Sequence, residues 1–160
     1  MSTYTIKPCF PAARDPNRQS GSSTIEFALV FPLFFAVFYA IAAYSLVMAL
    51  EQSLTYAAAE GARAAVAVDP TDFNNEGDYV NAIRNRSCVV ATERAGWLSE
   101  PPACASEVAA DAGDPDTRTV TLTLTYPYAA SPLVPVIDVP LIGEIPAVPD
   151  ELVVRAVGRI

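Results

Sequence analysis

The sequence predicts an α+β protein: a long N-terminal helix, part membrane span and part exported extension, followed by a small exported unit of one helix and about two antiparallel strands. Three observations predict this class. Residues 27–50 form a run of 24 residues without a charge. Residues 51–68 are rich in strong helix formers. Residues 119–126 alternate between apolar side chains and Thr, which is typical of a half-buried strand.

Residues 1–21 are predicted to be a cytoplasmic leader. Three prolines fall between residues 8 and 16, so we expect a flexible tail that ends at Gly21 and presents a cleavable junction. An ordinary secretory signal peptide is the alternative, but its apolar region is typically about 7–15 residues long. The run that follows is longer, so we expect no ordinary signal peptidase cleavage.

Residues 27–50 are predicted to cross a membrane once. A helix of 24 residues spans roughly 36 Å at about 1.5 Å per residue, and the hydrocarbon core of a bilayer is about 30 Å thick. The alternative is a buried core helix of a soluble protein. Such a helix is usually shorter and needs more surrounding chain to cover it.

The distribution of charge predicts the orientation of the span. Residues 1–20 carry three basic residues against one acid, whereas residues 51–160 carry seven Arg against sixteen acids. Basic residues near a span stay in the cytoplasm, so we expect a cytoplasmic N-terminus in the cytoplasmic (inner) membrane and a C-terminal domain exported to the periplasm or cell surface. The net charge of −8 also argues against a nucleic-acid partner.

The helix is predicted to continue beyond the membrane, giving one long helix over residues 22–68. Apolar and small residues recur at helical spacing in its exported part: Leu54, Ala58, Ala62 and Ala65. Asp69 and Pro70 then end the pattern. Within the span, Ala36, Ala40 and Ala43 are spaced so that another helix could approach closely, although Ala is also simply common in spans.

Residues 69–160 are predicted to form the exported α+β domain. Helical spacing of apolar residues predicts a second helix over residues 78–94. The C-terminal residues 151–160 alternate and could pair antiparallel with the strand at 119–126. The six prolines of residues 127–149 predict an extended, irregular connection between them.

Two cysteines of the exported part are candidates for a disulfide. Cys88 falls in the predicted second helix and Cys104 in the loop after it, on the side of the membrane where a disulfide persists. Two unrelated free thiols are the alternative. The third cysteine, Cys9, lies in the predicted leader.

Glu26 is a carboxylate at the head of the charge-free run. An ionisable residue at the edge of hydrocarbon costs free energy unless it finds a partner, which makes it a functional candidate. The alternative is that it lies in the first turn of the helix, where the macrodipole favours an anion.

The segments "GSSTIEFALVFPLFF" and "QSLTYAAAEGARAA" resemble the TadE family of minor pseudopilins from tight-adherence (Flp-type) pilus systems, which are type IV pilin-like. The resemblance implies that a prepilin peptidase cuts between Gly21 and Ser22. Glu26 would then be the fifth residue of the mature chain, followed by Phe27, and would pair with the new N-terminal amine. It also implies that other pilin-like subunits, a pilus assembly platform and membrane lipid are partners.

The sequence predicts no enzyme, cofactor or metal site. The chain contains no His, no G-x-S-x-G elbow and no glycine-rich phosphate loop. Asp72, Asn74 and Glu76 mimic the opening of a calcium loop, but Ile83 stands where the bidentate Glu is needed, so we expect a polar turn that caps the second helix.

Two functions therefore remain open. One is a minor pseudopilin that helps to assemble or prime a tight-adherence pilus serving cell adhesion. The other is a single-span anchored binding module whose exported domain does not join a pilus. Cleavage of the leader separates the two, because a plain anchor would keep its tail.

Overall fold

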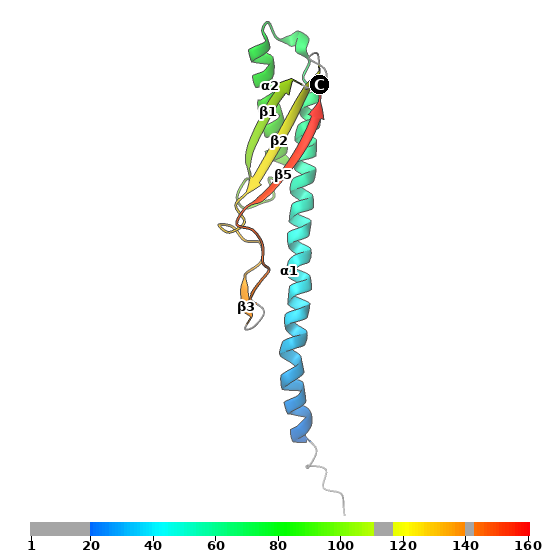
Figure 1. Cartoon of the computed structure of the whole chain (residues 1–160), viewed down its shortest axis with the longest axis vertical. Coiled ribbons are helices and arrows are strands. Elements are labelled where there is room, and N and C mark those ends of the chain that lie inside the picture. Colours follow the sequence, from blue (N-terminus) through cyan, green and yellow to red (C-terminus); the bar gives the residue numbers. More distant parts are fainter. Residues whose placement is uncertain (1–19, 111–116, 140–142) are drawn as a thin grey trace, which may run out of the picture. The chain divides into compact units, whose positions relative to one another are not determined.

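The computed structural model describes residues 20–110, 117–139 and 143–160 (Figure 1). The chain divides after Phe38 into two compact units, and each is described by itself. The first holds the described residues up to Phe38, and the second runs from Tyr39 to Ile160. Most of the predicted leader, residues 1–19, lies outside the described residues.

Helix α1, Ser20–Val66, contains 47 residues and ends just before Asp69 and Pro70, as expected. Its side chains from Ser23 to Phe35 are exposed, and they are predominantly apolar. From Ala43 onward one face is buried, and the four residues that were expected to recur on that face, Leu54, Ala58, Ala62 and Ala65, are each at most 4% exposed. The helical spacing of the sequence therefore identified the face of α1 that packs in the second unit.

Helix α2, Glu76–Arg94, confirms the predicted second helix and begins two residues earlier than expected. The short 3-10 helix η2, Pro70–Asp72, precedes it. Asn75 caps α2, because its side-chain oxygen accepts a hydrogen bond of 2.8 Å from the backbone N–H of Asp78. Ile83, Ser87 and Ala91 form the buried face of α2.

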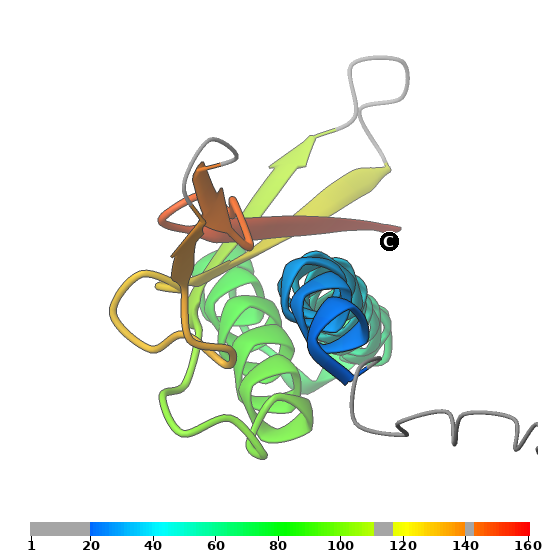
Figure 2. The ribbon, with the colours of Figure 1, turned by 90° about the horizontal axis from the view of Figure 1, so that it is seen from below.

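Three strands form an antiparallel sheet in the order β1-β2-β5: β1 (Ala103–Ala110), β2 (Arg118–Tyr126) and β5 (Leu152–Arg159). The predicted pairing of the C-terminal strand with the Thr-rich strand is confirmed, with Leu124 opposite Val154. Figure 2 shows α2 and α1 side by side on one face of this sheet. The apolar side chains of β2 point to that face and are buried: Val120, Leu122, Leu124 and Tyr126.

Strand β1 was not expected. The sequence placed Cys104 in a loop, whereas it lies in β1 opposite Leu124. Eight residues of β1 pair with β2, so ladder hydrogen bonds outweigh the helix preference of the Ala-rich segment.

The segment 127–149 contains a second, two-stranded sheet where only an irregular connection was expected. Strand β3 (Ile137–Val139) pairs antiparallel with β4 (Gly143–Ile145). None of the prolines of this segment falls inside either strand, so neither three-residue strand loses a backbone donor to proline.

A disulfide joins α2 to the edge strand β1. Cys88 and Cys104 are bonded, with an S–S distance of 2.01 Å and 5.7 Å between their Cα atoms, as the sequence predicted. Closing a loop of this length stabilises a folded unit by roughly 3 kcal/mol in the chain-entropy model. The bond therefore compensates for the small core of the second unit.

Candidate assembly site

The predicted processing junction lies at the start of α1. The helix begins at Ser20, so the backbone of Gly21 and Ser22 belongs to its first turn. The sequence predicted a flexible tail as far as Gly21, and the helix therefore starts earlier than expected.

Glu26 is the seventh residue of α1 and is exposed. The first turn of the helix contains no acidic residue. The macrodipole acts within about the first turn, so Glu26 lies beyond its main reach in the uncleaved chain, and the first-turn explanation stays a prediction for a chain that begins at Ser22. Two ion pairs between described residues are Arg63–Glu60 and Arg118–Glu76, and neither involves Glu26. Its carboxylate is available to a partner outside these residues.

Phe27 begins an exposed apolar surface on the first unit. Phe27 is 66% exposed, and its ring lies 5.3 Å from that of Phe31, which in turn lies 6.2 Å from the ring of Phe35. The large apolar side chains of this unit are all at least half exposed: Ile25, Phe27, Leu29, Val30, Phe31, Leu33, Phe34, Phe35, Val37 and Phe38. A surface of this size marks contact with lipid or with a protein partner. Among the described residues one helix, α1, is long enough and apolar enough to cross a membrane, by length and composition.

The predicted stripe of small residues divides into two parts. Ala36 and Ala40 are partly exposed, so another helix can reach them. Ala43 is 1% exposed in the isolated chain, because it belongs to the second unit, whose other elements cover that part of α1. A contact of Ala43 with another subunit would require the second unit to open, so only Ala36 and Ala40 stay candidates for packing against a second helix.

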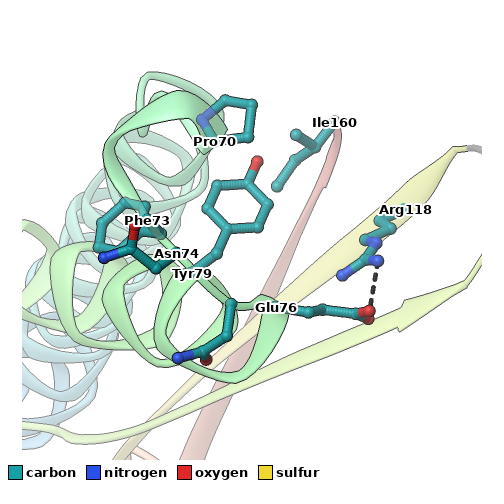
Figure 3. A pocket seen from close by; sticks show the side chains of 8 residues that line it. Pro70, Phe73, Asn74, Glu76, Tyr79, Arg118 and Ile160 are labelled. Carbon is teal, nitrogen blue, oxygen red and sulfur yellow. Dashed lines mark ion pairs between the residues drawn. The ribbon is translucent and has the colours of Figure 1, made fainter.

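A pocket of about 490 Å³ lies where η2, the start of α2, the start of β2 and the C-terminus meet (Figure 3). Tyr79 and Phe73 contribute rings 5.8 Å apart, and Arg118 forms an ion pair of 2.7 Å with Glu76. Eight residues line it: Pro70, Phe73, Asn74, Asn75, Glu76, Tyr79, Arg118 and Ile160. Sequence reasoning missed this pocket because its walls come from three distant parts of the chain.

Capping hydrogen bonds organise the turn beside this pocket. Asp69 accepts hydrogen bonds from the hydroxyl and the backbone N–H of Thr71, and these bonds lower the pKa of its carboxyl. Asn75 caps α2, as the sequence predicted for this polar turn. Over residues 20–110, 117–139 and 143–160, no group of three His, Cys, Asp or Glu side chains is placed to hold a metal ion. The arrangement around Asp69 and Asn75 thus serves helix capping.

Comparison with known families identifies the first part of the chain. A family described as TadE-like protein matches residues 21–63. Residues 21–63 are TadE-like. The resemblance predicted from the sequence is thereby confirmed for this segment, and the family is linked to assembly of tight-adherence pili. No curated protein and no solved structure matches the chain.

The TadE-like segment lies entirely within α1 and contains the junction, Glu26, Phe27 and the small residues Ala36 and Ala40. The predicted assembly residues therefore share one helix. The disulfide, the sheet and the pocket of Figure 3 lie outside the TadE-like segment.

Proposed function

We propose that this chain is a minor pseudopilin that helps to assemble or prime a tight-adherence (Flp-type) pilus at the cytoplasmic membrane. The observation that carries the proposal is the position of Glu26: an exposed carboxylate at the head of an exposed apolar helix, inside the TadE-like segment. A carboxylate in that place needs a cationic partner. The pseudopilin role supplies one, because cleavage creates a new N-terminal amine.

In this proposal a prepilin peptidase cuts between Gly21 and Ser22 on the cytoplasmic side. The subunit then remains in the membrane through α1, with its N-terminus cytoplasmic and its C-terminal domain exported. The excess of basic residues before the helix and of acids after it supports this orientation. The new amine pairs with Glu26 of the same or a neighbouring subunit.

Other pilin-like subunits and the pilus assembly platform are the proposed protein partners. The exposed apolar side chains that begin at Phe27 are available for lipid before assembly and for neighbouring helices afterwards. Ala36 and Ala40 would allow a neighbouring helix to approach closely. The family consists of structural or assembly proteins of pili, and this chain would act without catalysis.

A second candidate function is an anchored binding module, and one observation favours it. The pocket of about 490 Å³ lies outside the TadE-like segment and combines two aromatic rings with the Arg118–Glu76 pair, a mixture that suits recognition of a ligand. In such a module α1 would serve only as an anchor. In that case the apolar part of α1 could be replaced by any other membrane span without loss of function.

Exchange of the apolar part of α1 separates the two functions. Replacing residues 28–38 by an unrelated sequence of Leu and Ala keeps a span while changing the surface that other subunits would contact. We expect processed, membrane-resident protein and a loss of pili in a strain that lacks the native gene, counted by electron microscopy. The matched control is Arg118→Gln, which alters the pocket and should leave pilus numbers normal. Normal pili with the exchanged helix would favour the binding module.

A further inference from the structure

The structure places the start of the exported unit inside the charge-free run. The run covers residues 27–50, but the exported unit begins at Tyr39. Val47 and Leu50 are at most 6% exposed and belong to the core of that unit. A helix face that is covered by its own chain is not available to lipid, so the exported boundary of the membrane has to lie before these residues.

Two tyrosines mark the position of that boundary. The hydroxyl of Tyr39 donates a hydrogen bond to the backbone carbonyl of Pro135. The hydroxyl of Tyr44 accepts one of 3.1 Å from the backbone N–H of Ala147. Tyrosine is enriched where a membrane meets water, because its ring is apolar and its hydroxyl is polar. The helix therefore meets the segment that contains Pro135 and Ala147 at the level expected for the interface.

That segment exposes apolar side chains next to the same part of α1. Leu133 is 43% exposed, Val136 is 49% exposed and Ile137 is 39% exposed. Residues 127–149 contain no Lys or Arg. These three exposed apolar side chains, of which Ile137 begins β3, lie on a segment that is tied to Tyr39, and together they form an apolar surface on the second unit.

Two carboxylates keep the segment from entering hydrocarbon. Asp138 and Glu144 lie opposite each other in the β3–β4 pair, and both are exposed. Like charges in this arrangement repel each other and need water. The apolar side chains are more stable in lipid and the carboxylates are more stable in water. The headgroup layer of the membrane offers both environments.

We propose that Leu133, Val136 and Ile137 form a membrane-contact surface that lies on the lipid interface of the exported leaflet, beside Tyr39. The inference rests on the proposed membrane anchorage of α1 and adds a second point of contact with lipid. It leaves residues 22–38 for the membrane, and the charge-free part after Glu26, residues 27–38, is about 18 Å long at about 1.5 Å per residue. That part is shorter than a typical core of about 30 Å, so the bilayer has to thin locally around it, with Glu26 at the cytoplasmic edge.

Fluorescence quenching by brominated lipids tests this surface on the full chain. Single tryptophans are placed in a Trp97→Phe background, and the protein is reconstituted in vesicles of phosphatidylcholine and phosphatidylglycerol that carry bromine near the headgroup or near the chain end. Leu133→Trp should lose more fluorescence with bromine near the headgroup than near the chain end. Phe34→Trp, inside the span, should be quenched by both lipids. Val157→Trp, 63% exposed on the other face of the sheet, should be quenched by neither.

Each other outcome overturns a defined part of the account. Quenching of Phe34→Trp without quenching of Leu133→Trp would refute the contact surface and leave the anchor intact. Absence of quenching at Phe34→Trp would refute the anchor and with it the proposed function. A blue shift of Leu133→Trp that grows with the protein-to-lipid ratio, without quenching, would show that a second copy of the chain covers the surface instead of lipid.

Discussion

Glu26→Gln is expected to give processed, membrane-resident protein with lost or sharply reduced pili. The charge-free run is unchanged, so insertion is preserved. Removal of the carboxylate leaves the new N-terminal amine without its partner at the membrane edge. Breaking a buried ion pair by removing one partner costs about 3–5 kcal/mol, so docking of the subunit against its neighbours should fail. Pilus counts by electron microscopy and the yield of pili sheared from the cell surface measure the effect.

Glu51→Gln is the matched control. Glu51 bounds the other end of the charge-free run and is also exposed in α1. It lies far along the chain from the predicted new amine, so the same loss of one negative charge should leave pilus numbers normal. Equal pilus numbers in Glu26→Gln and wild type would contradict the pairing of Glu26 with the amine.

Gly61→Ala is expected to destabilise the second unit strongly. A Cβ at Gly61 would lie 2.6 Å from Cδ2 of Leu122, 2.6 Å from the carbonyl oxygen of Ser87 and 2.9 Å from Cβ of Ala91. The Leu122 side chain can move, but the Ser87 carbonyl belongs to the backbone of α2. Overpacking of this kind costs about 1–3 kcal/mol and occasionally more, which exceeds the gain of about 0.5–1 kcal/mol from replacing Gly by Ala in a helix.

The loss of stability is measured by unfolding the full chain with denaturant in detergent micelles. The fluorescence of Trp97 monitors the unfolding. The indole of Trp97 donates a hydrogen bond of 3.0 Å to the hydroxyl of Ser53 on α1, so its emission reports on the packing around that helix. Gly77→Ala is the control, because the nearest atom to its Cβ is 3.4 Å away. We expect a lower midpoint for Gly61→Ala and an unchanged or slightly higher one for Gly77→Ala. Equal unfolding midpoints for Gly61→Ala and wild type would contradict this prediction. They would show that α1 and α2 can move apart enough to accommodate the added Cβ without loss of stability.

Periodic segments of the sequence predicted their own structure. The 24-residue apolar run and the spacing of Leu54, Ala58 and Ala62 gave α1, and the alternation of Thr with apolar residues gave β2. Strand β1 was missed because "ACASEVAA" has no strong strand pattern and becomes a strand through its partner β2. Pairing between distant segments is a property of the folded chain, and local preference does not contain it.

The candidate site was predictable where its residues are close in sequence. Gly21, Ser22, Glu26 and Phe27 form one short motif, and the helix carries them as a unit. The pocket and the hydrogen bond from Tyr39 to Pro135 join residues that are far apart in the chain, so no local sequence pattern predicts them. For the same reason the charge-free run did not indicate that α1 joins the second compact unit at Tyr39.

The N-terminal residue of the protein isolated from membranes tests the central claim most directly. Mass spectrometry of the intact protein and of its N-terminal peptide identifies that residue. We predict that the mature chain begins at Ser22, which would leave Glu26 four residues from the new amine. A mature protein that still carries residues 1–21 would contradict the pseudopilin proposal and leave α1 as a plain anchor.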